Sequence, residues 1–489
     1  MKKGLLALLL AFVLVTFAAC RNGGSDVTDP NGSETGTKEN TAGETTGFSV
    51  GYAMKDITPT EPVPLAGYGN TDQRISEGFL SYLMTTCTAI TDEKGTSVLL
   101  FANDLIGTKD EVLSDWKKAV SDATGVPESN IIFTGSHTHS GPDLNQEKMA
   151  AIARYKDVLL KTFAEVAKEA MEDRSEATMF GTTTEMTGLS FQRHFVLKDG
   201  TKWGYSDPDS NPAVDYAGYI DHTLQLVKFV RKDKNPDKKD IILTNWQVHP
   251  HRAGGQKVYN MTADIAGIYR DTLAKETDCF VQYITGAAGN TNPTSPISRD
   301  NITKDFKEQG KAMAQYAIDA EGTYKELKTG DIKVENFSFT ASIDHSMDGM
   351  LANAKEVQAF WTKSNDINAT KEFGAPYGIN SPYHANKIVG ISQLPQTQTI
   401  GFTVCAVGDF AFACFPGEMF AKGGMMVKEG SPYEMTFFIG YSNGHNGYFP
   451  TEDAFEYVGY ETDITRFSRG TAEAIANEFV KHLTDLKSK

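Results

Sequence analysis

Residues 130–142 read Asn-Ile-Ile-Phe-Thr-Gly-Ser-His-Thr-His-Ser-Gly-Pro. The β-branched and aromatic run, followed by small residues and Gly-Pro, predicts a buried strand that ends in a loop. In extended backbone, His137 and His139 would point to the same side. They would then place two metal ligands, or one ligand beside one proton carrier, at the mouth of a sheet. The alternative is two histidines that only cap a loop.

The N-terminus has the pattern of an export signal. Lys2 and Lys3 form a basic start, residues 5–17 are apolar, and Phe17-Ala18-Ala19-Cys20 is typical of a bacterial lipoprotein cleavage site. The apolar run is short for a membrane-spanning helix. We therefore expect residues 1–20 to be a signal peptide and Cys20 to carry a lipid that anchors the exported protein to the outside of the cell membrane. An ordinary secretory signal with a chance cysteine is the alternative.

The next segment, residues 21–47, consists almost entirely of small, polar and acidic residues. Such a composition buries too little apolar surface to offset the entropy of ordering, and it predicts a flexible linker. We expect one large folded body, or two closely packed domains, in residues 48–489.

Charge and cysteine content restrict the possible partners of this body. The chain has 63 acidic and 47 basic residues, a formal charge of −16, which argues against binding nucleic acid or docking electrostatically on anionic lipid. Any lipid contact would have to be apolar and local. Four cysteines follow Cys20, and none has the spacing of a zinc finger or a redox pair, so we expect buried free thiols at Cys87, Cys279, Cys405 and Cys414.

Strand-like and helix-like segments alternate along the body, and several strands are adjacent in sequence. This pattern predicts an α/β class, a mixed α+β layered domain with large sheets, and argues against a regular βα barrel. Residues 186–222 and 364–397 are rich in Gly, Pro, Asn, Tyr and Ser, which predicts long loops that frame a site. Strands are expected at 84–91, 96–103, 130–135, 176–183, 223–230, 240–248, 279–285, 333–343, 398–407, 410–415 and 434–440. Helices are expected at 109–122, 148–172, 262–276, 303–321, 351–363 and 466–485.

Three further strand ends carry groups that could hold a metal or move a proton. An apolar strand ends in His249-Pro250-His251, another is followed by Pro416-Gly417-Glu418, and a third leads into the polar segment that contains Tyr448. In α/β enzymes, ligands and catalytic groups usually lie beyond the carboxyl ends of strands. Two histidines and one carboxylate are also a familiar catalytic zinc set.

Each of these residues also has a purely structural explanation. Glu418 could be a carboxylate in the first turn of a helix, Tyr448 a core or rim aromatic, and His251 a partner for loop carbonyls. Four such strand ends in one domain favour a shared site.

The sequence resembles the neutral/alkaline (non-lysosomal) ceramidase family, zinc-dependent amidases that split ceramide into sphingosine and a fatty acid. The similarity covers most of residues 48–465, the family's catalytic N-terminal domain, and its most specific motif is Gly135 to Pro142. Further similar segments are Gly51 to Thr58, Gly67-Tyr68-Gly69, Asn245-Trp246 with His249, Pro416-Gly417-Glu418, Asn443 to Thr451, and Tyr460-Glu461.

The resemblance implies a Zn²⁺ ion and roles for particular residues. His137, His249, Glu418 and Tyr448 match the zinc ligands of the family, whereas His139, Arg193 and Tyr460 match residues around the reacting carbonyl. Zinc would lower the pKa of water to about 7 and polarise an amide oxygen. His139 would then move a proton to the leaving amine, and Arg193 and Tyr460 would hold the oxyanion or orient the substrate. The expected substrate is a small-molecule or lipid amide.

Two features depart from the family. The segment that resembles its Gly-Asp-Val-Ser-Pro-Asn motif reads Gly289-Asn290-Thr291-Asn292-Pro293-Thr294, so Asn292 stands where the family has a functional serine. Asn292 cannot act as a nucleophile, but hydrolysis by metal-activated water survives the change. Nothing after Tyr460-Glu461 matches the family's C-terminal immunoglobulin-like domain, so we expect substrate access to differ.

Two other functions remain open from the sequence. One is a binuclear metal hydrolase of another amide or ester that uses both His-x-His pairs together with Asp264. The other is a substrate-binding lipoprotein that keeps the scaffold without turnover. Among these three functions, a zinc-dependent amidohydrolase is the first expectation. The sequence leaves open whether ceramide is its substrate.

Overall fold

The computed structural model describes residues 47–489, except 70, 72, 108–109, 147, 205–212, 234, 236, 256, 296, 298–304 and 458. Residues Gly43–Lys489 form one compact unit. The predicted signal peptide, and the predicted linker up to residue 46, lie outside the described residues. The divisions predicted at residues 20 and 47 therefore remain predictions.

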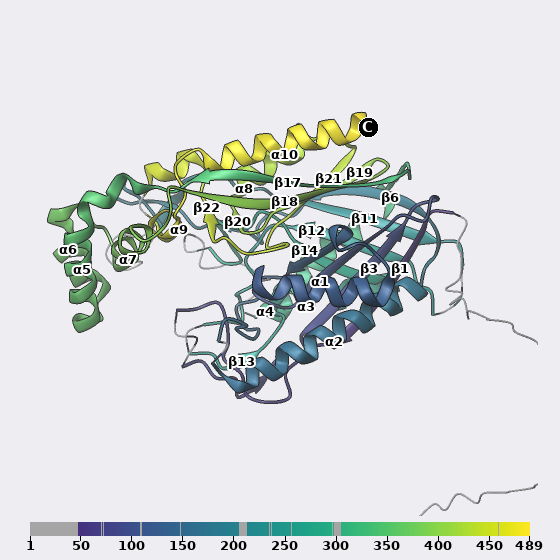
Figure 1. Cartoon of the computed structure of the whole chain (residues 1–489), viewed down its shortest axis with the longest axis horizontal. Coiled ribbons are helices and arrows are strands. Elements are labelled where there is room, and N and C mark those ends of the chain that lie inside the picture. Colours follow the sequence, from purple (N-terminus) through teal and green to yellow (C-terminus); the bar gives the residue numbers. More distant parts are fainter. Residues whose placement is uncertain are drawn as a thin grey trace, which may run out of the picture. The chain divides into compact units, whose positions relative to one another are not determined.

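The larger of two main sheets runs through the N-terminal half of the chain (Figure 1). Its strand order is β14-β12-β11-β6-β1-β3-β4-β5, and β16 pairs with β6. Most neighbours are antiparallel, but β4 with β5 and β12 with β14 are parallel. The strands are β1 (Ser49–Asp56), β3 (Met84–Thr91), β4 (Ser97–Asn103), β5 (Ile131–Gly135), β6 (Ser175–Glu185), β11 (Thr223–Arg231), β12 (Ile241–Trp246), β14 (Phe280–Thr285) and β16 (Lys325–Leu327).

A second sheet from the C-terminal half packs face to face on the first. It consists of β17 (Ile332–Ser342), β18 (Thr397–Val407), β19 (Phe410–Cys414) and β21 (Met435–Ile439), in that order. One apolar cluster joins the inner faces, with Leu100 and Leu243 from the larger sheet and Phe412 and Phe437 from the second. The continuous apolar runs of β4, β5, β12, β19 and β21 follow from this packing, because these strands are buried on both faces.

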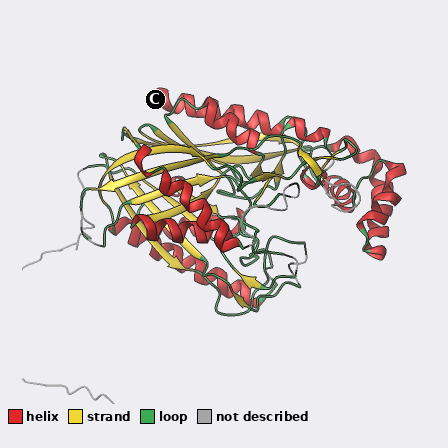
Figure 2. Cartoon of the chain, turned by 180° about the vertical axis from the view of Figure 1, so that it is seen from behind, coloured by secondary structure: helices red, strands yellow, loops and turns green. Residues whose placement is uncertain are grey.

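Helices cover the outer face of each sheet, so the body has four layers: helices, sheet, sheet, helices (Figures 1 and 2). The larger sheet carries α1 (Asp110–Thr124), α2 (Ala150–Glu172), α3 (Asp264–Thr277) and α4 (Phe306–Asp319). The second sheet carries α8 (Ala421–Gly430) and α10 (Thr471–Ser488). This arrangement confirms the predicted mixed α/β layered class.

The segment 364–397, predicted to be a long loop, instead contains two helices. With α5 (Leu351–Ser364), α6 (Ile367–Gly374) and α7 (Pro382–Ile391) form a small helical projection with its own apolar core. The prediction was wrong because cap residues look like loop residues. Asp366 accepts hydrogen bonds from the first turn of α6, and Ser381 does the same for α7, which begins with a proline.

The other predicted loop, 186–222, holds four short strands in its described part. β7 (Phe191–Gln192) pairs with β15 (Thr291–Asn292), and β8 (Phe195–Leu197) pairs with both β9 (Lys202–Trp203) and β10 (Ala213–Tyr216). Four other two-residue strands form two pairs: β20 (Glu418–Met419) lies beside β22 (Tyr448–Phe449), and β2 (Gly78–Phe79) lies beside β13 (Asn260–Met261). Short helix α9 (Tyr460–Ile464) follows β22.

All the predicted strands and helices are confirmed, with boundaries that differ by a few residues at most. Besides α6, α7 and the short strands above, the pattern missed β1, α8 and α9. Cys87, Cys279, Cys405 and Cys414 are buried free thiols, as predicted. Among the described residues, no helix is both long and apolar enough to cross a membrane.

Candidate active site

Three polar side chains converge at strand ends from both sheets. His137 follows β5, His249 follows β12, and Glu418 lies in β20, after β19. The Glu418 Oε2 atom lies 3.3 Å from His137 Nε2 and 3.2 Å from His249 Nε2. All three side chains are buried. Glu418 precedes α8 and is not in its first turn, which excludes the structural explanation considered for it.

Backbone carbonyls set the orientation of the two histidines. His137 Nδ1 lies 2.6 Å from the carbonyl oxygen of Ile106, and His249 Nδ1 lies 2.7 Å from that of Ala288. A carbonyl only accepts, so Nδ1 carries the proton in each ring. Nε2 is therefore free to face the site with its lone pair, as is usual for histidines that bind metals.

The charge state of these groups suits a cation. Burial lowers the pKa of His249 to about 4, so this imidazole is neutral at pH 7. Burial alone would raise the pKa of Glu418, but His137 and His249 lower it well below its usual range. A neutral Nε2 with its lone pair toward the site and an ionised carboxylate are both acceptors, so at 3.2 Å a proton or a metal ion lies between them. The donor set therefore fits a divalent metal such as Zn²⁺.

His139 lies against the same group but differs from the two other histidines. Its Nε2 lies 3.3 Å from His137 Nε2, and the ligand atoms of His137, His139 and His249 all lie within 4.8 Å of one another. This trio could hold a metal ion. However, His139 Nδ1 is buried and makes no hydrogen bond to the described residues, so nothing fixes the ring as a ligand.

The backbone that brings His137 and His139 together is not the extended strand that their spacing suggested. β5 ends at Gly135, and His137 has a left-handed backbone with φ 67°. Such a conformation is unfavourable for a residue with a side chain and persists only where the surrounding structure holds it. Gly67 packs closely against the His139 ring. A Cβ at position 67 would lie 2.4 Å from the His139 side chain, so only glycine fits there.

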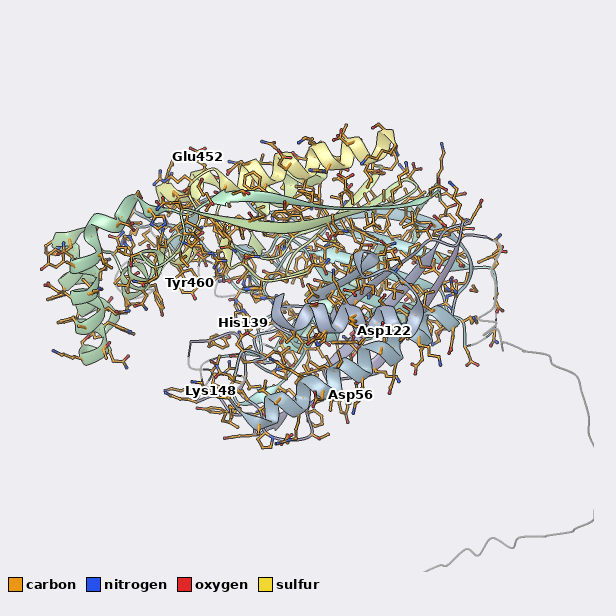
Figure 3. All side chains as sticks on the ribbon, in the orientation of Figure 1. Asp56, Asp122, His139, Lys148, Glu452 and Tyr460 are labelled. Atoms are coloured by element: carbon orange, nitrogen blue, oxygen red, sulfur yellow. The ribbon has the colours of Figure 1, made fainter. Side chains whose placement is uncertain are left out.

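A cavity of about 640 Å³ opens above these residues, and His139 is the member of the trio that lines it. The walls come from distant parts of the chain and include Tyr68, Arg193, Tyr448 and Tyr460. In Figure 3, His139 lies in the N-terminal half of the fold and Tyr460 lies across from it, at α9. The cavity thus has a basic side chain and several aromatic rings around its polar floor.

Arg193 is held at the cavity wall by a buried carboxylate. Its Nη1 atom lies 3.0 Å from Glu461 Oε1 and donates a hydrogen bond to the Tyr448 hydroxyl at 3.3 Å. His194 approaches the other Glu461 oxygen at 3.2 Å. Burial would raise the pKa of Glu461, but Arg193 and His194 lower it to about 2, so Glu461 is ionised and Arg193 stays charged.

The remaining predicted residues also lie at the site. Tyr448 is the direct partner of Glu418 across β20 and β22, so both side chains are on the same face. The Tyr460 ring lies 6.0 Å from the Tyr448 ring. Asn292 lines the cavity, and His251, whose pKa burial lowers to about 3, donates its Nε2 proton to Asn292 Oδ1 at 3.1 Å. The structure gives no direct contact between the Tyr448 hydroxyl and the histidines.

Asp264, proposed for a second metal, faces the backbone instead. Its two carboxylate oxygens accept hydrogen bonds from the amides of Arg252, Ala253 and Ile265. These hydrogen bonds occupy the Asp264 carboxylate and stabilise the loop that follows His251. The binuclear arrangement therefore lacks the ligand that it requires.

Three residues at the site were not predicted as functional. Glu461 was noted only as part of a motif. His445 Nε2 lies 3.4 Å from Glu418 Oε1, on the side of the carboxylate away from His137 and His249. Tyr441 stacks on the His137 ring at 3.9 Å, and its buried hydroxyl makes no hydrogen bond to the described residues. Only their proximity to the predicted strand ends could have indicated them.

Comparison with solved structures identifies the fold. A neutral ceramidase from Pseudomonas aeruginosa superposes with a TM-score of 0.67 and 16% sequence identity, over 91% of this chain and 75% of that chain. A structure described as ceramidase complexed with C2 gives the same score and identity, over 91% and 76%. No protein-family model and no curated protein sequence matches the chain. The body thus has the fold of neutral ceramidase, as the motifs implied.

Proposed function

We propose that the chain is a zinc-dependent amidohydrolase that cleaves an amide bond in an N-acylated, lipid-like substrate. The observation that carries this proposal is the convergence of His137 Nε2, His249 Nε2 and the Glu418 carboxylate within 3.3 Å, under a large cavity. A zinc ion held by these three groups, with Tyr448 as a fourth ligand, would supply Lewis-acid activation of water and of the amide carbonyl.

The other residues have complementary roles in this proposal. His139 lines the cavity and has an unpartnered ring nitrogen, so it can pass a proton to the leaving amine. Arg193 and Tyr460 line the same cavity, where their donors would stabilise negative charge on the carbonyl oxygen. Glu461 keeps Arg193 charged and in place.

The substrate class follows from the cavity and from the fold. The structural neighbours are ceramidases, and ceramide is a lipid amide. Aromatic walls at Tyr68, Phe195 and Tyr383 suit an apolar acyl chain. Asn292 and His251 form a neutral polar pair at the wall, so the head group meets an amide where the ceramidase motif has a serine. We propose a lipid amide of this general kind, with a head group that Asn292 can bind.

We also propose that the protein is exported and anchored to the outer side of the cell membrane through lipid on Cys20. The basic start, the short apolar run and the small residues before Cys20 support this location. Labelled fatty acid should be incorporated into the parent chain in cells and not into Cys20→Ser.

A substrate and chelator screen tests the proposed function. The purified protein should contain one zinc per chain and should hydrolyse at least one member of a panel of N-acyl amides and esters, and a chelator should abolish this activity. Glu418→Gln should lose both zinc and activity, whereas Glu326→Gln, an exposed glutamate in β16, should keep both. Activity that resists the chelator would contradict the zinc mechanism. Substrate binding without turnover would indicate the substrate-binding lipoprotein instead.

A further inference from the structure

The helical projection has a partly exposed apolar surface beside its own core. Ile367 and Phe373 on α6 are 40% and 37% exposed. The Phe373 ring stacks on Phe360 of α5 at 4.5 Å, and Tyr377 lies next to it at 6.3 Å. Trp361, in the last turn of α5, is half-buried. These five residues are called the α5–α6 surface below.

The α5–α6 surface continues into the cavity of the candidate site. Ile367 belongs to both, because it lines the cavity and is exposed at the start of α6. Tyr383, on α7, lines the cavity next to it. Figure 1 shows α5 and α6 extending away from the two sheets at the end where α7 and α9 lie. Whatever covers this surface therefore also lies at the mouth of the cavity.

The charges on these helices favour an uncharged partner. The chain as a whole carries −16, but acidic and basic residues balance along α5, α6 and the residues between them. The charged residues are Lys355, Lys363 and Lys371 against Glu356, Asp366 and Glu372. A strongly acidic protein is repelled by anionic lipid over most of its surface, so a neutral apolar projection is the part that can approach a bilayer.

The composition of the surface matches that of protein segments at membrane interfaces. Tryptophan and tyrosine prefer the boundary between head groups and acyl chains, with lysines nearby that extend toward water. The surface has Trp361 and Tyr377 beside phenylalanine and isoleucine, with Lys363 and Lys371 flanking them in sequence.

The N-terminal segment would hold the body close to such a surface. A flexible chain with the length of residues 21–47 has a root-mean-square reach of about 30 Å. With lipid on Cys20 and the predicted flexible linker, the folded body would lie on average about that far from the bilayer. At the resulting high effective concentration, even a weak apolar contact would be occupied.

We propose that the α5–α6 surface rests on the lipid bilayer and turns the mouth of the cavity toward it. Phe373, Ile367 and Trp361 would enter the interface between head groups and acyl chains, while the balanced charges stay in water. A lipid amide could then move from the bilayer into the cavity without crossing water. The contact itself does not depend on catalysis; only this purpose rests on the proposed function.

Vesicle flotation tests the contact without any turnover. The protein is the chain from residue 20 onward with Cys20→Ser, which takes no lipid and keeps the whole compact unit. It should float with phosphatidylcholine vesicles, with an affinity that changes little with salt or with added phosphatidylglycerol. Phe373→Glu should weaken binding about tenfold or more, because an aromatic side chain leaves the apolar phase and a charge replaces it.

Two further variants give the control and an independent readout. Val158→Glu alters a valine on α2 that is 54% exposed, and it should bind vesicles like the parent. Trp361 should report insertion through a blue shift in fluorescence and quenching by brominated lipid. The chain has four tryptophans, so the measurement is made in a Trp203→Phe background. The buried Trp116 and Trp246 should not respond, and a further Trp361→Phe change should remove the signal while binding persists.

Several results would overturn the proposal. One is that Val158→Glu weakens vesicle binding as much as Phe373→Glu does. The others are that binding requires anionic lipid, or that the protein binds no vesicle at all. A parent that is dimeric and becomes monomeric in Phe373→Glu, without vesicle binding, would assign the surface to a second copy. Flotation with no hydrolysis of any amide would keep this proposal and contradict the proposed function.

Discussion

His137 and His139 are separated by one residue, but the structure gives their rings different partners. His137 has its Nδ1 proton on the carbonyl of Ile106 and its Nε2 toward Glu418. His139 has an unpartnered Nδ1 and faces the cavity. A histidine that holds a metal usually has its second nitrogen fixed by a hydrogen bond. This difference favours His137 as a ligand and His139 as a residue that contacts substrate.

Alanine variants of the two histidines should therefore separate metal binding from catalysis. His137→Ala should lower zinc affinity by about 100-fold or more, since one ligand is removed. His139→Ala should keep affinity within about tenfold of the parent and still lose most activity, because a proton carrier typically contributes 10²–10⁴-fold to a rate. Competition with a fluorescent zinc chelator measures the affinity, and His482→Ala on α10 is the control. Equal loss of zinc in both variants would instead make all three histidines ligands.

The Glu461 carboxylate should make stability depend on pH. Its pKa is about 2 in the folded protein, below that of an ordinary glutamate, so ionised Glu461 stabilises the fold above about pH 4.5. This contribution, on the order of 3 kcal/mol, should be lost as the pH falls from about 5 to 2. Urea unfolding of the parent and of Glu461→Gln at several pH values measures it. The gap between the two unfolding free energies should narrow toward low pH, and a constant gap would contradict the assigned pKa.

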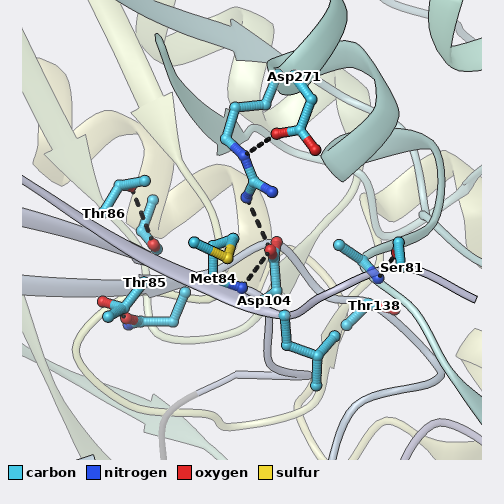
Figure 4. Close-up of polar contacts among 12 residues, drawn as sticks. Ser81, Met84, Thr85, Thr86, Asp104, Thr138 and Asp271 are labelled. Carbon is cyan, nitrogen blue, oxygen red and sulfur yellow. Dashed lines mark hydrogen bonds and ion pairs between the residues drawn. The ribbon is translucent and has the colours of Figure 1, made fainter. Parts of the chain in front are cut away.

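At the scale of elements, the loop after β4 positions His137 and is itself held by α3. Leu105 and Ile106 supply the carbonyls that accept from the His137 amide and ring. Just before them, Asp104 accepts hydrogen bonds from Arg270 of α3 at 2.7 Å and from the amide of Met84 at 2.9 Å (Figure 4). The ion pair is almost fully buried. A helix on the outer face thus fixes a loop at the site.

Breaking this pair should destabilise the protein and loosen the metal site. Arg270→Met leaves the Asp104 carboxylate buried without its cation, which should lower the free energy of unfolding by about 3–5 kcal/mol. Asp122→Asn, which breaks the exposed pair with Lys118, should cost about 1 kcal/mol or less. Urea unfolding measures both. The double variant Asp104→Asn/Arg270→Met should recover part of the loss, and a loss as large as in Arg270→Met would show that the helix packing, rather than the charge, was disturbed.

The same elements show what the sequence can and cannot predict. Strands such as β5 and β19 were predicted because both faces are buried and their apolar runs are unbroken. β1 was missed because it includes Gly51 and ends in Lys55 and Asp56, and α6 was missed because its cap residues resemble a turn. The pairing of β5 with β4 and of β19 with β21 depends on contacts between distant residues, which local patterns do not contain.

The candidate site was predictable only to the extent that each residue belongs to a strand end or a motif. His137, His249 and Glu418 come together as expected. At His137, however, a left-handed backbone places the side chain, and not the extended strand that the sequence predicted. His445 reaches Glu418 only because β20 and β22 lie side by side. A single histidine in a polar loop has no local signal that distinguishes it from a solvent-exposed residue.

For the whole molecule, the candidate metal centre joins the two sheets. His137 and His249 lie beyond strands of the larger sheet, and Glu418 follows β19 of the second sheet. Hydrogen bonds also link the sheets at this edge, among them Gly440 N to Thr285 O and Asn443 N to Phe133 O, and an apolar cluster joins their faces. A bound ion would therefore connect the sheets at the edge where the cavity opens.

Removal of the metal should accordingly lower the stability of the whole body. A ligand at about 1,000 times its Kd stabilises the folded state by about 4 kcal/mol, so the chelated protein should unfold at a lower temperature by a few degrees. Glu418→Gln should already unfold at the lower temperature, and a chelator should change it little, because the connection between the sheets is missing. Calorimetry with and without a chelator measures the shift, and adding zinc back should restore it where excess magnesium does not. The same melting temperature for parent and chelated parent would mean that packing and hydrogen bonds join the sheets without the ion, and that a bound ion serves only the reaction.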